Sequence, residues 1–205
     1  LMLPSASLTP HISAAQLRPL LISNLVYGDR YAALFLEQHL KSLLDPSNIP
    51  NLRDRVEYLI FTDEETLPKL TSHANFFHLN SIIPVHGSLF KWGDQVNKYD
   101  FRYDLLVQTF KESTRIALQK GAILSAMVAD MIVAKEYLPG LMDKFRQGYG
   151  AVFCLPIRSA AEAMVPLLKK YPGAVPTQEL FELAYNNLHP LWVACHWDTT
   201  LFSKI

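Results

Sequence analysis

The sequence lacks an excess of charge of either sign. Its 205 residues include 19 basic and 19 acidic side chains, so the formal net charge is zero, and half of the chain is hydrophobic. A binder of long nucleic acids needs a basic surface, and a disordered chain has few apolar residues. The composition therefore excludes both classes and predicts one compact domain with a sizeable core.

The sequence also lacks long apolar runs and is poor in cysteine. Its longest apolar stretch, residues 122–134, is interrupted by Asp130 and is shorter than the roughly 20 residues that span a bilayer. The first residues lack the basic segment of a secretory signal. We therefore expect no transmembrane segment, a cytoplasmic location, and reduced thiols at Cys154 and Cys195. We expect an irregular leader over residues 1–18 and a single domain over 19–205, as a piece of a longer protein.

Several motifs that bind nucleotides or carry out catalysis are absent. The chain has no G-x-x-x-x-G-K-[ST] phosphate loop, no G-x-G-x-x-G after its first expected strand, and no C-x-x-C pair. The segment 86–89, His-Gly-Ser-Leu, lacks the second glycine of a G-x-S-x-G nucleophile turn. These absences disfavour P-loop proteins, dinucleotide enzymes and serine hydrolases of the α/β type.

Strand-like and helix-like segments alternate along the chain. The pattern predicts strands over residues 19–27, 56–61, 76–79, 122–129, 131–134 and 151–155. It predicts helices over 30–44, 66–72, 100–120, 137–147, 160–171 and 178–188, and a long loop over 80–97. This alternation indicates an α/β protein, a three-layer sandwich around a mostly parallel, mixed sheet. In such sheets, ligands bind outside the carboxyl ends of the strands.

Five residues stand at or just beyond the ends of expected strands. Tyr27 and Gly28 follow the first strand, and Thr62 and Asp63 close the second. Asp130 interrupts two apolar segments, so we expect it to be largely buried or at a strand end. A carboxylate there either caps a turn or meets a ribose hydroxyl or a divalent ion. Asp63 either caps the next helix or contacts a ribose or a base.

Other polar residues have less specific surroundings. Asn24 lies inside an apolar strand, where its amide needs partners and either ties neighbouring backbone together or reaches a ligand. The seven histidines show no metal-ligand spacing; His196 and Asp198 form either a weak ligand pair or ordinary polar surface. Each cysteine is either a buried small apolar residue or a nucleophile.

The order of these parts resembles the nucleotide-diphospho-sugar transferase fold, the GT-A type of glycosyltransferase. The resemblance rests on the apolar strand that runs into Tyr27-Gly28-Asp29-Arg30-Tyr31, on the strand that ends in Phe61-Thr62-Asp63, and on the long helix before Asp130. It covers residues 19–197. It implies transfer of a sugar from a nucleotide-sugar donor to an unknown hydroxyl acceptor, with a divalent metal, manganese or magnesium, at a D-x-D pair.

The resemblance also implies roles for particular residues. Tyr27 and Gly28, with Asn24 and Thr62, would approach the nucleotide, and Asp63 would face uridine or its analogue. Asp130 would be one carboxylate of the D-x-D pair.

The D-x-D motif is degenerate in this chain, because Asp130-Met131-Ile132 has no second aspartate. His196 is the expected second metal ligand. If no metal is bound, Lys111 and Arg115 are the candidates to neutralise the diphosphate. They lie four residues apart, and the alternative is that they form a solvated helix face.

Two other functions stay open. The missing second aspartate favours a catalytically inactive binding module with the same fold. An α/β hydrolase that uses Cys154 or Cys195 is a weaker alternative. No catalytic base is assigned, since a retaining transfer does not need one.

Overall fold

Four parallel strands form the centre of the protein. The computed structural model describes residues 18–90, 98–154 and 156–194, apart from the side chains of 98–102. The strands are β1 (Leu20–Leu25), β2 (Val56–Thr62), β3 (Val85–Leu89) and β4 (Ile123–Val128), in the spatial order β3-β2-β1-β4. All pairs between them are parallel, so the α/β prediction is confirmed, while the antiparallel part of a mixed sheet is not among the described residues.

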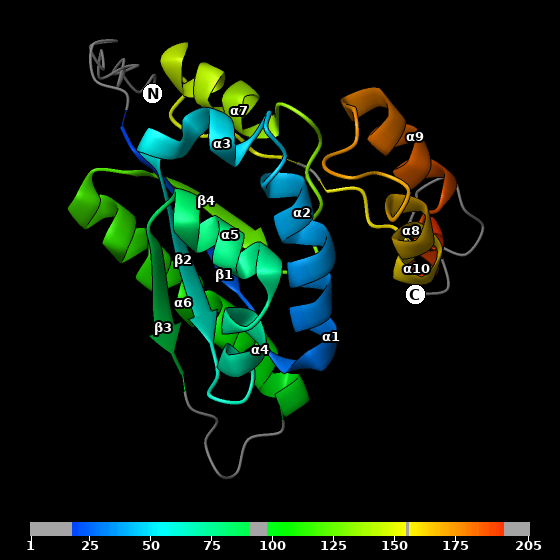
Figure 1. Ribbon diagram of the computed structural model, residues 1–205, viewed down its shortest axis with the longest axis horizontal. Coiled ribbons are helices and arrows are strands. Elements are labelled where there is room, and N and C mark those ends of the chain that lie inside the picture. The colour runs from blue at the N-terminus through cyan, green and yellow to red at the C-terminus, as the bar shows by residue number, and fades with distance from the viewer. Residues whose placement is uncertain (1–17, 91–97, 155, 195–205) are drawn as a thin grey trace, which may run out of the picture.

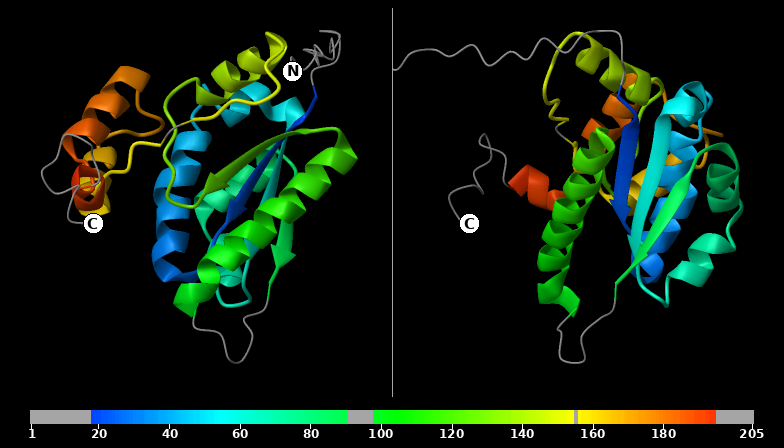
Figure 2. Two further views of the ribbon diagram at one scale, coloured as in Figure 1. Left: turned by 180° about the vertical axis from the view of Figure 1, so that it is seen from behind. Right: turned by 90° about the vertical axis from the view of Figure 1, so that its left-hand side faces the viewer.

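Helices cover both faces of this sheet, as Figures 1 and 2 show. The helices are α1 (Gly28–Leu34), which continues through a π-helical turn (Phe35–His39) into α2 (Leu40–Leu43); α3 (Ile49–Leu52), followed by a 3₁₀ turn (Arg53–Arg55); α4 (Leu67–Thr71), α5 (Ala74–Ile82), α6 (Lys98–Lys120), α7 (Tyr137–Arg146), α8 (Ala161–Leu168), α9 (Thr177–Asn186) and α10 (Pro190–Ala194). In the part of the chain that is described, no helix is both long and apolar enough to cross a membrane.

The sheet separates two apolar clusters. Leu20 and Ile22 of β1 pack toward α1, α2 and α5, whereas Leu21 and Leu25 pack toward α6. Every residue of β1 is buried, which explains its continuously apolar sequence. The chain moves from β1 to β2 and β3 in one direction and then returns through α6 to the other side of β1. The strand order therefore reverses between β1 and β4, where open sheets of this type form a crevice.

Two predicted elements next to β2 are wrong. Residues 76–79 belong to helix α5 and not to a strand. The His73 side chain accepts a hydrogen bond from Asn75 N–H at 3.2 Å and so caps the start of this helix. Phe76 packs on the core, whereas Phe77 is 74% exposed. The expected loop over 80–97 contains strand β3, an exposed edge strand whose weak apolar pattern hides it.

Two further strands expected after β4 are absent from the described sheet. Over residues 131–134 only Ala134 makes a bridge, to Val175. The Ser42 hydroxyl accepts a hydrogen bond from Val133 N–H at 3.2 Å, and the Asn48 amide donates to the Ala134 carbonyl at 3.0 Å. These side chains replace a strand partner for this segment. Residues 151–154 also make no ladder.

The helices of the C-terminal part are tied to the sheet layer by the buried carboxylate of Asp45. Its Oδ2 accepts from Ala174 N–H at 2.9 Å, and its Oδ1 accepts from the Ser47 N–H and hydroxyl at 3.0 and 2.6 Å. Burial raises the pKa of Asp45, but these hydrogen bonds and the charge of Lys135 together outweigh it, so that the pKa lies below its ordinary value. Asp45 therefore favours the folded state when ionised.

We expect Asp45→Ala to lower the free energy of unfolding by about 2–3 kcal/mol at pH 7, because hydrogen bonds to a charged group are lost. Since the folded-state pKa is depressed, this contribution is present above the ordinary aspartate pKa and is lost as pH falls through the folded value. Urea denaturation at pH 7 and pH 3 measures both effects. Asp54→Ala, at a carboxylate that is 91% exposed, is the control; an equal effect of both variants at pH 7 would contradict the prediction.

Candidate functional site

Three of the predicted site residues follow the same rung of the sheet. Leu25 of β1 lies between Phe61 of β2 and Val128 of β4 in register. Tyr27, Asp63 and Asp130 each come two residues after that rung. Neighbouring strands are about 4.8 Å apart, so these three positions follow one another along the carboxyl edge over about 10 Å. Tyr27 and Asp130 flank the point where the strand order reverses.

The turn between β1 and α1 is locked to the end of β2. Gly28 has a positive φ of 71°, a conformation that glycine adopts without strain, and its N–H donates to the Thr66 hydroxyl at 2.9 Å. The Thr66 N–H in turn donates to Asp63 Oδ1 at 2.8 Å. Asp63 is only 4% exposed, so one of its oxygens caps this turn. Thr62, one residue earlier, is buried, and its hydroxyl has no hydrogen-bond partner among the described residues.

Aromatic side chains gather beside this turn. The Tyr27 ring lies 6.1 Å from the Tyr31 ring and packs edge-on against Phe90, 6.2 Å away, just after β3. The Phe90 N–H donates to the Thr62 carbonyl at 3.0 Å, which fixes Phe90 at the carboxyl edge. Tyr31 is 39% exposed, so part of this cluster offers a ring face to a planar ligand.

Arg30 and Lys69 are cations that the described residues place at this edge. Lys69 pairs with Asp29, immediately after Gly28, and Arg30 lies 3.6 Å from Glu162 of α8. Both ion pairs are exposed, and exposed pairs contribute little to stability, so either cation is available to an anionic ligand.

The structure places Arg115 away from this edge. Ser113, two residues before it, contacts Ser23 in the middle of β1 at 2.6 Å, and Lys120 beyond it pairs with Glu57 near the start of β2. Arg115 therefore lies toward the amino edge of the sheet. It is paired with Glu112 at 2.5 Å and Gln119 at 2.9 Å. Lys111 is exposed on the same helix.

Asp130 lies in the turn that follows β4, as one of its two expected positions requires, but its side chain is exposed and not buried. Within the described residues no hydrogen bond or ion pair holds its carboxylate. His196, its expected metal partner, lies outside the described residues. Among the described residues no group of three or more histidine, cysteine, aspartate or glutamate side chains forms a metal cluster.

A buried polar chain links Asn24 to the residue after Asp130. The Tyr58 hydroxyl hydrogen-bonds to the side-chain amide of Asn24 and lies 3.0 Å from His39 Nε2, and His39 Nδ1 lies 2.5 Å from the Met131 carbonyl. Asn24, Tyr58 and His39 are each at most 1% exposed. This relay ties β1, β2 and the π-helical turn to the loop that carries Asp130. The structure therefore places Asn24 in the core behind the edge.

Burial sets the charge of the relay. It lowers the pKa of His39 to about 4, while the hydrogen bond to the Met131 carbonyl acts in the opposite direction. A neutral His39 has one N–H, which donates to that carbonyl from Nδ1, and its Nε2 then accepts a hydrogen bond from the Tyr58 hydroxyl. The phenol has only that proton to donate, so a neutral His39 requires the amide nitrogen of Asn24 to face Tyr58. The other side-chain amide atom of Asn24 is buried and has no hydrogen-bond partner in the described part of the chain.

Comparison of the chain with protein-family models, with curated proteins and with solved structures gives no match. Conclusions about function therefore depend on the geometry of the described residues alone.

Sequence reasoning missed Thr66, Lys69, Arg30, Phe90 and His39. Arg30 stands within the segment that follows the first strand, and His39 is a polar residue on an apolar helix. Each position therefore has a weak local signal in the sequence. The contacts of Lys69 and Thr66 span 40 and 38 residues and have no local pattern.

Proposed function

We propose that the protein is a glycosyltransferase of GT-A type that binds a nucleotide-sugar donor at the carboxyl edge of its sheet. The observation that carries this proposal is that Tyr27, Asp63 and Asp130 follow one rung of the sheet and that Tyr27 and Asp130 flank its topological switch point. That is the position at which parallel α/β sheets bind nucleotides. The acceptor is a hydroxyl of undetermined identity.

Different residues of the edge contact different parts of the donor. The aromatic cluster of Tyr27, Tyr31 and Phe90 supports the planar base. Asp63 holds the turn between β1 and α1 through Thr66 and so shapes the edge that the base or ribose would approach. Lys69 and Arg30, which replace Arg115 in this role, neutralise part of the diphosphate charge and so stabilise the leaving group. Holding donor and acceptor in place reduces the entropic barrier to transfer.

A divalent metal fits this edge only in part. Manganese and magnesium prefer oxygen ligands and are often held by one or two carboxylates together with substrate phosphates. Asp29 is paired with Lys69, whereas Asp130 is an exposed carboxylate beside the switch point with no partner among the described residues, so the diphosphate itself must supply further ligands. When bound, the metal would supply charge that stabilises the departing diphosphate. Met131, held by His39, keeps Asp130 at the strand end.

The single carboxylate also favours a second candidate, a binding module that holds the nucleotide without transferring the sugar. Both candidates use the same edge, but only the transferase releases free nucleoside diphosphate. The two are therefore separated by turnover and not by affinity.

We expect the protein to release UDP from a UDP-sugar in the presence of manganese, slowly when water is the only acceptor. A coupled assay for UDP, run over a panel of UDP-sugars and repeated with GDP-sugars, measures this. Lys69→Ala is expected to reduce the rate, while Lys144→Ala, at an exposed lysine on α7, serves as the control. Saturable UDP binding with no release from any donor would support the binding module instead.

A further inference from the structure

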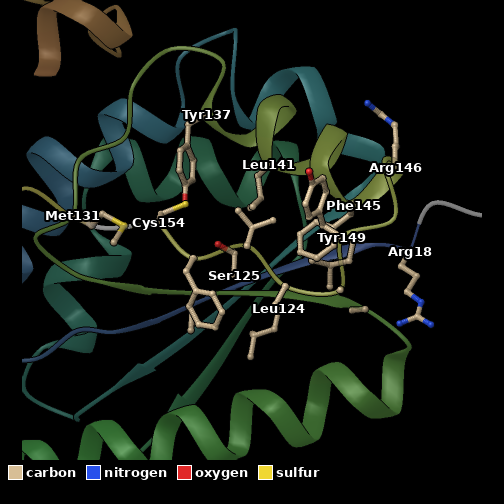
Figure 3. Close-up of a pocket in the computed structure, with 17 residues that line it drawn as sticks. Arg18, Leu124, Ser125, Met131, Tyr137, Leu141, Phe145, Arg146, Tyr149 and Cys154 are labelled. Atoms are coloured by element: carbon tan, nitrogen blue, oxygen red, sulfur yellow. The ribbon is translucent and has the colours of Figure 1, made fainter. Parts of the chain in front are cut away.

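A cavity runs along the outer edge of β4. Its volume is about 530 Å³. One wall is the strand itself, from Ala122 to Ala126, and the opposite walls are helix α7 and residues 149–154. Figure 3 shows Arg18 at one end of this cavity and Met131 with Cys154 at the other.

The edge of β4 that faces the cavity carries unpaired backbone groups. Ile123 N–H donates to the Pro19 carbonyl at 2.8 Å, so the backbone groups of Ile123 face β1. Because backbone direction alternates along a strand, Leu124 and Ala126 turn their N–H and C=O groups outward. Within the described chain these groups have no backbone partner. An open strand edge of this kind is a template for another strand.

The backbone of the opposite wall also has no strand partner among the described residues. Residues 151–155 have the composition of a strand, yet residues 151–154 form no ladder and their backbone N–H groups donate to no described backbone carbonyl. The side chains of this wall are exposed, Phe153 by 91%. The open edge of β4 and the unpaired backbone of residues 151–154 thus flank one cavity.

The ends of the cavity differ in chemistry. At one end Arg18 is exposed and has no ion-pair partner among the described residues, and Arg146 is paired with Asp143. At the other end the Tyr137 hydroxyl lies 3.5 Å from Cys154 Sγ. The walls between are formed by Leu141, Phe145 and Tyr149 of α7 and the turn after it. An occupant therefore needs an acidic group at the Arg18 end and apolar groups beyond it.

We propose that this cavity is a slot for one extended peptide strand of a partner protein, which pairs with β4 and places an acidic side chain against Arg18. Strand addition supplies the affinity through backbone hydrogen bonds, and the arginine end sets the position of the peptide. If the transfer proposed above operates, a hydroxyl on this peptide is the acceptor, because the cavity reaches Met131, next to Asp130.

The test uses a fluorescein-labelled peptide, acetyl-Glu-Val-Thr-Val-Thr-Val-Glu, with glutamate at both ends so that either strand direction reaches Arg18. Fluorescence anisotropy without nucleotide is expected to show saturable binding. The same peptide N-methylated at alternate amides, which keeps its side chains, is expected to bind at least tenfold more weakly. Arg18→Glu is expected to weaken binding about tenfold, whereas Arg53→Glu, at an exposed arginine outside the cavity, leaves it unchanged.

Hydrogen exchange separates this slot from its alternatives. The Leu124 and Ala126 amides are expected to exchange rapidly in the free protein and to become protected when the peptide binds. Slow exchange of both amides in the free protein would show that the chain closes its own edge, and would overturn the proposal. Equal affinity for the N-methylated peptide, or no effect of Arg18→Glu, would also overturn it. Since no nucleotide is present, these outcomes are independent of the transferase function.

Discussion

His39→Leu is expected to lower the free energy of unfolding by about 2–4 kcal/mol at pH 7. The leucine fills the space of the imidazole but leaves the Met131 carbonyl without its partner in the core. Tyr58 also loses its contact with the ring. Each buried polar group without a partner costs about 1–3 kcal/mol. Urea denaturation followed by circular dichroism measures the loss.

A double-mutant cycle with Tyr58→Phe tests whether the relay acts as one unit. We expect the double variant to lose less free energy of unfolding than the sum of the two single losses. The reason is that Tyr58→Phe removes a hydroxyl that His39→Leu has already left without its partner. His86→Leu provides the control, since His86 is exposed and pairs only with Glu57 at 3.0 Å. A cost for His39→Leu no larger than that for His86→Leu would show that the relay does not stabilise the fold.

The relay also predicts an acid dependence of stability. Because burial lowers the pKa of His39 from 6.5 to about 4, the unfolded chain binds a proton at this site before the folded chain does. The stability from His39 is full above pH 6.5 and falls as pH drops toward 4, by about 3 kcal/mol in all. The wild-type protein should show this loss between pH 6.5 and 4.5. In His39→Leu the slope over that range should be smaller; equal slopes would contradict the assignment.

The second large effect is expected at Asp130. Asp130→Ala should reduce manganese-dependent affinity for UDP at least tenfold, because Asp130 is an exposed carboxylate beside the switch point with no partner among the described residues and is therefore open to a metal. Binding without manganese should change much less. Asp54→Ala removes an exposed carboxylate near the amino edge of the sheet and should leave affinity unchanged.

Calorimetric titration of UDP into each variant, with and without manganese, measures both quantities. If Asp130→Ala binds as tightly as the wild-type protein in manganese, Asp130 holds neither metal nor diphosphate. The donor would then depend on Lys69 and Arg30 alone.

The sequence predicts those parts of the fold that carry a strong local pattern. Strands β1 and β2 are buried and almost continuously apolar, and α6 is long and amphipathic, so each is recognised from its own residues. Strand β3 is short, exposed and contains Gly87, and only its pairing with β2 makes it a strand. The Phe76-Phe77 pair fits either a strand or a helix, and the cap from His73 decides for the helix.

The candidate site is predictable to the extent that it depends on strand ends. Tyr27, Asp63 and Asp130 are found because each follows an apolar strand. The cations are not, since Lys69 approaches Asp29 only after β2 and α4 have packed beside β1. The burial of Asn24 is predictable from its strand, but its link through Tyr58 and His39 to Met131 joins four separate segments and exists only in the folded chain.

A crystal structure of the protein with UDP and manganese tests the central claim most directly. The account predicts the base beside Tyr27 and Phe90, the ribose toward Asp63, and the diphosphate between Lys69 and Asp130 at the carboxyl ends of β1, β2 and β4. Density for UDP in the cavity along β4, or at the amino edge near Arg115, would contradict it. So would an edge that remains empty at a nucleotide concentration at which the protein binds UDP in solution.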